Sequence, residues 1–293
     1  MSSPNEDEQI GFIGLGVMGH SMAAHLMQAG YELHLHTRTR AKAEDLLEKG
    51  ATWHDSAGAV ARQARVVITI LGYPRDVEDI YLGPDGIIDN APTGTLLIDM
   101  TTSSPALARR IHAEAGKRGL GSLDAPVSGG DTGARDARLS IMVGGDREDF
   151  DRASSILQVM GKNILYQGPA GCGQHTKMAN QIAIAAGMLG VCEALAYAKR
   201  AGLDQDTVLE SIGGGAAGSW SLSNLGPRMI KGAFAPGFYV KHFLKDMEIA
   251  LDSARKLGLP VPGLELAEKL YRKLAKEGGA DLGTQALYRL YDE

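Results

Sequence analysis

The chain has 293 residues, 44% of them hydrophobic, and a formal net charge of −5. This composition predicts a globular protein of one large domain or two. The acidic balance and an aromatic content of 5% argue against nucleic-acid binding, which uses basic surfaces and stacking platforms. Two cysteines, Cys172 and Cys192, are too few for a disulfide scaffold. The polar residues 1–8 resemble no signal or transit peptide, and no uninterrupted apolar run reaches membrane-spanning length. We therefore expect a cytoplasmic protein without membrane partners.

A glycine-rich turn lies near the start of the chain, between a predicted strand and a predicted helix. The apolar run 9–16 is typical of a buried parallel strand, and residues 20–29 form a helical pattern. The intervening GxGxxG motif permits a tight turn, close backbone approach to a pyrophosphate and close helix–strand packing. The helix N-terminus supplies free amides. We therefore predict that a nicotinamide dinucleotide binds at Gly14, Leu15, Gly16, Val17, Met18 and Gly19.

The end of the second predicted strand, 31–36, indicates which dinucleotide is bound. NAD enzymes commonly carry an acid here for the ribose hydroxyls, but this chain has none and reads Thr37-Arg38-Thr39 instead. A guanidinium can pair with a 2′-phosphate, and a hydroxyl can donate to it. We therefore expect NADP(H) to be preferred over NAD(H). The alternative is that these residues form the solvated start of the next helix.

Two further buried strands lead to loops that should meet the cofactor. The run 65–71 ends at a Gly-Tyr-Pro break, which should bring Leu71 to the crevice where ligands of parallel sheets bind. The run 94–99 leads to consecutive hydroxyl residues, among them Thr102. These hydroxyls either touch the nicotinamide side of the cofactor or cap the helix predicted over 106–118.

Another predicted strand runs into the sequence Asp-Ala-Pro-Val-Ser-Gly-Gly, which ends at Gly130. Ser128 with the freely angled backbone of Gly129 and Gly130 makes a compact anion receptor, suited to a substrate carboxylate. The alternative is a plain glycine-rich loop without a ligand.

The alternation of strands and helices predicts an α/β fold, a Rossmann doubly wound parallel sheet. Composition changes after Gly168, where strand signals disappear. Helical patterns then cover 174–201, 207–212, 244–257, 263–276 and 284–290. We predict an NAD(P)-binding Rossmann domain over 8–168 and an all-helical substrate and oligomerisation domain over 169–293.

The longest predicted helix carries polar side chains at helical spacing in an otherwise apolar segment. Lys177, Asn180 and Gln181 stand at i, i+3 and i+4, so they share one face. Buried polar groups need partners, and a bound substrate could be one. Lys245-Asp246 is either a structural charge pair or part of the same pocket. No spacing of His, Cys, Asp or Glu is typical of a metal site.

Four motifs in order resemble the β-hydroxyacid dehydrogenases, which include 3-hydroxyisobutyrate dehydrogenase, tartronate semialdehyde reductase and glyoxylate/succinic semialdehyde reductases. They are the glycine motif, the run ending at Gly130, the Lys177-containing helix and the Lys245-Asp246 pair, and the resemblance covers about residues 10–291. The chain departs from the usual pattern conservatively at Thr101-Thr102. It also departs around Gly283, which puts any specific substrate name in doubt.

The resemblance implies roles for these residues. Lys177 matches the catalytic lysine that donates a proton to the carbonyl oxygen, and Ser128, Gly129 and Gly130 match the substrate carboxylate binders. Asn180 matches a residue that orients substrate, Lys245 one that lines the substrate and cofactor site, and Thr37 to Thr39 look like an NADP-type ending. Such enzymes are usually homodimers or homotetramers.

We therefore predict an NADPH-preferring oxidoreductase that interconverts a small aldehyde or keto acid and its hydroxy acid. One alternative is an imine reductase-like enzyme, although imine reductases generally replace the lysine that Lys177 matches. The other is a non-catalytic NADP-binding scaffold, which would have no need for Lys177, Asn180 and Ser128 together.

Overall fold

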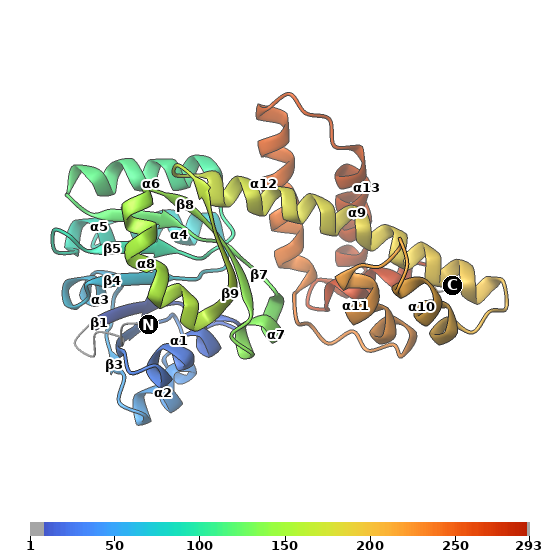
Figure 1. Cartoon of the computed structure of the whole chain (residues 1–293), viewed down its shortest axis with the longest axis horizontal. Coiled ribbons are helices and arrows are strands. Elements are labelled where there is room, and N and C mark those ends of the chain that lie inside the picture. The colour runs from blue at the N-terminus through green and yellow to red at the C-terminus, as the bar shows by residue number, and fades with distance from the viewer. Residues whose placement is uncertain (1–8, 292–293) are drawn as a thin grey trace. The chain divides into compact units, whose positions relative to one another are not determined.

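The computed structural model describes residues 9–291 of the chain (Figure 1). They divide into two compact units, of which the first ends at Lys177 and the second begins at Met178. The division falls inside the long helix α9 (Cys172–Arg200). Among the described residues, the first unit has a hydrophobic core on each face of its sheet, and the second unit has a core of its own.

The first unit is built on a sheet whose strand order is β3-β2-β1-β4-β5-β6-β8-β7, with β9 paired to β8. Its strands are β1 (Gln9–Ile13), β2 (Glu32–His36), β3 (Thr52–Trp53), β4 (Val66–Thr69), β5 (Leu96–Asp99), β6 (Gly121–Asp124), β7 (Val127–Ser128), β8 (Leu139–Gly145) and β9 (Gly161–Gly168). The order reverses direction at β1, as in doubly wound folds. The predicted α/β fold is therefore confirmed.

The prediction of a parallel sheet holds for β1 to β6 and for the β8–β9 pair. It is wrong for β8, which runs antiparallel to β6 and β7. A parallel crossover needs a dozen or more residues. Here only the short helix α7 (Gly130–Arg135) and its flanking turns join β7 to β8, so the chain reverses direction.

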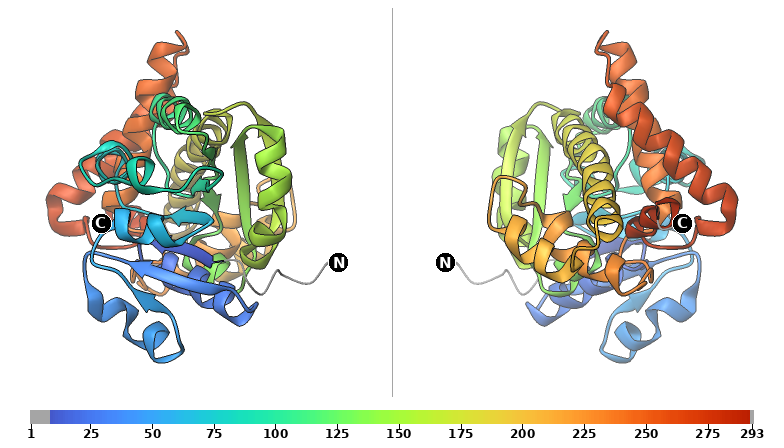
Figure 2. Two further views of the ribbon diagram at one scale, coloured as in Figure 1. Left: turned by 90° about the vertical axis from the view of Figure 1, so that its left-hand side faces the viewer. Right: turned by 90° about the vertical axis from the view of Figure 1, so that its right-hand side faces the viewer.

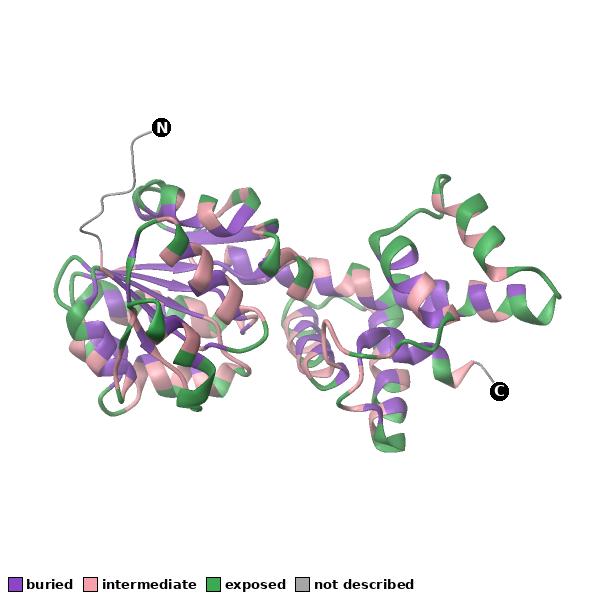
Figure 3. Cartoon of the chain, turned by 90° about the horizontal axis from the view of Figure 1, so that it is seen from below, coloured by how far each residue is buried: buried purple, intermediate pink, exposed green. Residues whose placement is uncertain are grey.

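Helices cover both faces of the sheet, each over its own core (Figures 1 and 2). Successive strand residues point to opposite faces, so Ile68 packs in one core and Val67 in the other. The first core is covered by α1 (Gly19–Gln28), α2 (Glu44–Glu48), α7 and α8 (Arg147–Met160). The second is covered by α3 (Ala57–Gln63), α4 (Pro74–Leu82), α5 (Ile87–Asn90) and α6 (Pro105–Lys117). The central strands β1, β4, β5, β6 and β8 are mostly buried between the two layers (Figure 3), whereas β3 and most of β9 are exposed or half-buried.

The second unit packs helices around one core. After α9 come α10 (Gln205–Gly213), α11 (Trp220–Ile230), α12 (Val240–Lys256), α13 (Pro262–Leu274), the π turn η2 (Ala275–Gly279) and the 3₁₀ helix η3 (Thr284–Leu290). Sequence patterns missed α11, because it follows a glycine-rich stretch and contains Pro227, which normally ends a helix. They also started α12 too late, since its first turn already buries Val240 and Phe243.

Helix α9 is long and apolar enough to cross a membrane by length and composition, although polar residues such as Asn180, Gln181 and Glu193 interrupt its apolar run. Half of its most apolar window is buried inside the protein. Met188, Cys192 and Leu195 lie in the core of the second unit, as expected for the central helix of a folded domain.

Candidate active site

The glycine turn between β1 and α1 has the geometry that a pyrophosphate requires. Gly14 has a φ of +103°, and a Cβ there would lie 2.2 Å from the backbone oxygen of Ile70. A Cβ on Gly19 would lie 2.0 Å from the Gly14 oxygen. Gly16 has no atom within 4 Å of its Cβ position. Gly14 and Gly19 are thus required by packing, whereas Gly16 leaves open space in which a ligand can approach the backbone.

The N-terminus of helix α1 lies at this turn, and no acidic side chain of the helix's first turn occupies it. Its N-cap residue Met18 makes no side-chain cap, and the first turn contains no acidic residue. Val17 is 56% exposed, whereas Leu15 is buried in the core. The first-turn amides and the positive end of the helix dipole can therefore serve a phosphate.

The segment after β2 leaves the Arg38 side chain in solvent. Thr37 Oγ1 accepts a hydrogen bond from the Leu15 amide at 3.4 Å, so it supports the glycine turn. The Arg38 side chain is 84% exposed and lies 3.8 Å from Asp76. Thr39 precedes the 3₁₀ helix η1 (Arg40–Ala43) without capping it through its side chain. Sequence patterns had given no sign of Asp76, because the contact joins different elements.

The hydroxyl residues after β5 have two different structural roles, as their hydrogen bonds show. Thr101 Oγ1 accepts from the Leu71 amide at 2.8 Å, and the Thr101 amide donates to Asp99 at 3.0 Å. Ser104 accepts from the Leu107 amide and caps α6. The capping alternative is therefore correct for Ser104. Thr101 instead ties together the loops after β4 and β5, and Thr102 lies between these two anchored residues.

Asp124, at the end of β6, holds the beginning of α9. Its carboxylate accepts from the amides of Gly171 at 2.7 Å and Gln174 at 2.8 Å. Burial raises the Asp124 pKa to about 6, while these two amides act in the opposite direction. Lys177 follows one turn after Gln174, and its side chain is buried, with 6% exposed. The helix that carries Lys177 is thus fixed to the carboxyl edge of the sheet.

The predicted carboxylate receptor lies where β7 passes into α7. Ser128 ends β7 and pairs with Ser140 of β8. Gly129 and Gly130 have φ values of +133° and +64°, which side chains rarely adopt. A Cβ on Gly130 would meet no atom within 4 Å. The glycines are required by the turn itself, and the backbone of Gly130 is open to a ligand.

In the second unit, Lys245 and the polar face of α9 belong to one hydrogen-bonded chain. Asn180 donates to Gln181 at 2.7 Å, and Gln181 donates to the carboxylate of Asp246 at 2.6 Å. Lys245 pairs with the other oxygen of Asp246 at 2.9 Å. Gln181 and Asp246 are buried, so they fix the positions of Asn180 and Lys245. The linking role of Asp246 was not evident from the sequence.

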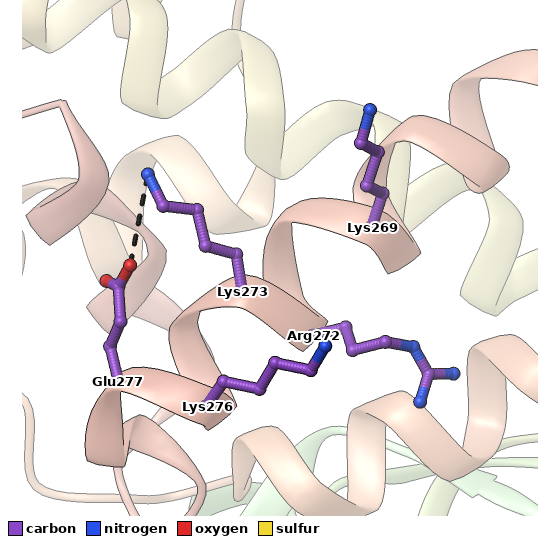
Figure 4. Close-up of a pocket in the computed structure, with 5 residues that line it drawn as sticks. All are labelled: Lys269, Arg272, Lys273, Lys276 and Glu277. Carbon is purple, nitrogen blue, oxygen red and sulfur yellow. Dashed lines mark ion pairs between the residues drawn. The ribbon is translucent and has the colours of Figure 1, made fainter.

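A hollow of about 420 Å³ lies elsewhere, on the exposed face of α13 and η2 (Figure 4). Its lining is basic apart from Glu277, which pairs with Lys273 at 3.9 Å. Arg272 is already paired with Glu248 and Glu268. None of the predicted site residues lines this hollow, and its side chains belong to a charged helix surface.

Comparison with known proteins identifies the family. Residues 9–168 match the NAD binding domain of 6-phosphogluconate dehydrogenase, and residues 171–291 match the NAD-binding domain of NADP-dependent 3-hydroxyisobutyrate dehydrogenase. The chain belongs to the 3-hydroxyisobutyrate dehydrogenase-like β-hydroxyacid dehydrogenase family. It is therefore an NAD(P)-dependent oxidoreductase, as the sequence motifs predicted.

Three relatives match over nearly their whole length. An uncharacterised oxidoreductase of Bacillus subtilis is 58% identical, with 96% of this chain and 98% of that one covered. The 2-hydroxy-3-oxopropionate reductase of Escherichia coli is 39% identical, with 95% of each chain covered. The structure of Mycobacterium tuberculosis 3-hydroxyisobutyrate dehydrogenase with L-serine has a TM-score of 0.89 and 32% identity, with 98% of this chain and 99% of that chain covered.

Proposed function

We propose that the protein is an NADPH-preferring reductase that interconverts a small aldehyde or keto acid with the corresponding hydroxy acid. The observation that carries the proposal is the placement of Lys177. This buried lysine stands on a helix whose first turn is bonded to Asp124, at the carboxyl edge of the same sheet that carries the open Gly16 turn. Ligands of doubly wound sheets bind at this edge.

Lys177 is proposed to be the proton donor of the reaction. When bound, the nicotinamide cofactor supplies a hydride to the carbonyl carbon. The carbonyl oxygen then gains negative charge and must receive a proton. The Lys177 ammonium can give one N–H proton to that oxygen and is itself left as a neutral amine, which regains a proton from solvent. The reverse reaction removes the hydroxyl proton by the same route.

The other site residues are proposed to bind and orient the substrate. Ser128 with the backbone of Gly129 and Gly130 provides donors for a carboxylate, because an open left-handed turn presents its amides to an anion. Asn180 and Lys245 provide further polar contacts, held by Gln181 and Asp246. A carboxylate handle away from the reacting carbon lets binding energy serve the reaction. The family's serine-bound and oxopropionate-reducing relatives support a small carboxylate substrate.

For the cofactor, we propose that residues 14–19 hold the pyrophosphate and that Leu71 and Thr102 lie on the nicotinamide side. Arg38, with Thr37 and Thr39, is proposed to favour the 2′-phosphate of NADPH. The exposed guanidinium supports this preference, as does the absence of an acid directly after β2. The matched family model is described as NADP-dependent.

We also propose that the protein assembles into a homodimer or homotetramer through the second unit. That unit exposes large apolar side chains at Tyr197 (74%), Trp220 (58%) and Leu257 (68%). Light scattering coupled to size-exclusion chromatography measures the assembly directly, and a monomeric mass would reject this part of the proposal.

The testing experiment is a turnover assay with glyoxylate, succinic semialdehyde, tartronate semialdehyde and methylmalonate semialdehyde, each with NADPH and with NADH. We expect one acid to be reduced far faster than the rest, with a higher kcat/KM for NADPH. Faster reduction with NADH would refute the cofactor preference. NADPH binding without turnover of any acid would refute the reaction class and favour a C=N substrate or a scaffold.

A further inference from the structure

We propose that Gln174 is a positioning residue that fixes the loop of residues 100–104, called the Thr102 loop, relative to Lys177. This inference rests on the proposed function, because it assigns Thr102 to the cofactor and Lys177 to the proton. It adds a residue that the sequence motifs did not single out for any role. Its basis is the set of hydrogen bonds around one fully buried amide.

The Gln174 side chain binds the backbone on both sides of Thr102. Its oxygen accepts from the Ser103 amide at 2.9 Å, and its nitrogen donates to the Thr101 carbonyl at 2.7 Å. A single planar amide thus fixes two consecutive peptide groups of the loop. Because the side chain is 0% exposed, water cannot replace these bonds without a rearrangement of the loop.

The same residue is fixed on its helix side. The Gln174 backbone amide donates to Asp124 at 2.8 Å, and Gly171 donates to the other carboxylate oxygen at 2.7 Å. Lys177 follows three residues later, so its Cα lies about one helical turn further along α9. The bonds of Gln174 therefore connect the loop that bears Thr102 directly to the turn that precedes Lys177.

The network extends beyond Gln174 to the neighbouring strands. Thr101 Oγ1 accepts from the Leu71 amide at 2.8 Å, and the Thr101 amide donates to Asp99 at 3.0 Å. Asp99 also accepts from Thr69 at 2.9 Å. The ends of β4, β5 and β6 and the start of α9 are thus one connected polar unit, in which Gln174 joins the loop after β5 to α9 by two hydrogen bonds.

This geometry has a catalytic consequence. A hydride and a proton must arrive at one carbonyl group, so the cofactor loop and the proton donor must be aligned to a fraction of an ångström. A displacement of about 1 Å can cost a factor of about 10² in rate. Loss of the Gln174 amide would leave α9 anchored by Asp124, while the loop that bears Thr102 would lose two hydrogen bonds to the helix.

The test is Gln174→Met in the full-length protein, with Gln205→Met as the matched control. Gln205 likewise makes two side-chain hydrogen bonds, both from its amide nitrogen, to the Leu195 carbonyl and the Tyr288 hydroxyl, and it lies in the second unit. We expect Gln174→Met to lower kcat about 10- to 100-fold, with an NADPH Kd within about threefold of wild type. Hydrogen exchange of the cofactor-free protein should become faster at residues 101–104. Gln205→Met should leave kcat, the NADPH Kd and the exchange at residues 101–104 unchanged.

A double-mutant cycle with Lys177→Ala separates positioning from general destabilisation. If Gln174 acts through Lys177, Gln174→Met should cost less than about twofold in the Lys177→Ala background, because coupled residues are non-additive. Equal losses in both backgrounds would overturn the proposal. Absence of turnover in the wild type would instead reject the proposed function, while the exchange experiment would still test the loop connection. Unchanged exchange would overturn that connection.

Gln174→Glu provides a second variant if Gln174→Met does not fold. The glutamate keeps an acceptor for the Ser103 amide but, when ionised, lacks a donor for the Thr101 carbonyl. Protonation restores that donor. The activity of Gln174→Glu relative to wild type should therefore rise as the pH falls, and a pH-independent ratio would contradict the positioning role.

Discussion

Replacement of Asp124 by Asn should change the pH dependence of folding stability. Burial raises the Asp124 pKa from 3.8 to about 6 in the folded protein. Between pH 4 and pH 6 the folded chain therefore holds a proton that the unfolded chain has released. Stability from this group is fully present below about pH 4 and is lost as the pH rises toward 6. At about 1.4 kcal/mol for each pH unit between the two values, the loss is about 3 kcal/mol.

Asn has no proton to release, so Asp124→Asn removes this dependence. Its amide can accept only one of the two backbone bonds, from Gly171 or Gln174. The unpaired buried amide costs about 1–3 kcal/mol at every pH. Relative to the variant, the wild type should thus be most stable near pH 4 and lose about 3 kcal/mol of that advantage by pH 7.

Urea denaturation of both proteins from pH 4 to pH 8 measures this difference. Asp204→Asn is an informative control, because hydrogen bonds from Thr207 lower the Asp204 pKa. A group with a lowered pKa keeps its contribution to stability above the ordinary carboxyl pKa and loses it only at lower pH. The wild-type advantage over Asp204→Asn should therefore stay nearly constant from pH 4 to pH 8. A wild-type advantage over Asp124→Asn that is constant, or that grows with pH, would refute the reasoning.

Four further substitutions test the cofactor site. Gly14→Ala should prevent stable folding, because its Cβ would lie 2.2 Å from a backbone oxygen. Gly16→Ala should instead keep the wild-type Tm and weaken NADPH binding about tenfold or more. Thermal melts and fluorescence titrations compare the two variants, and equal losses of Tm would contradict the assignment. Arg38→Ala should weaken NADPH binding but leave NADH binding within about twofold, and parallel losses for both cofactors would remove Arg38 from the 2′-phosphate site. Asp76→Asn should strengthen NADPH binding about two- to fivefold by freeing Arg38, whereas an unchanged or lower NADPH affinity would show that Asp76 does not compete with the phosphate.

The sequence was most informative where function and local structure impose the same residue. Gly14 is required by a φ of +103° and by packing against Ile70, so the motif predicted both the turn and its ligand. The buried strands were recognisable as short apolar runs, because burial itself requires apolar side chains. The family assignment followed from the order of four such motifs and is confirmed by the matches over 9–168 and 171–291.

Contacts between distant segments could not be predicted. Nothing local indicates that Asp124 accepts amides from Gly171 and Gln174, since 47 and 50 residues separate the partners. The direction of β8 could not be read from its apolar pattern, because the short connection between β7 and β8 determines it. Helix α11 was hidden by Pro227, which the structure accommodates inside the helix.

The most direct test of the central claim is the turnover of Lys177→Ala with the best acid of the substrate panel. If Lys177 gives the proton, kcat should fall by about 10²- to 10⁴-fold while the Kd for NADPH stays near the wild-type value. Added methylamine, which can occupy the truncated position and donate a proton, should restore part of the rate. An unchanged kcat, measured with NADPH and substrate at saturation, would contradict the account.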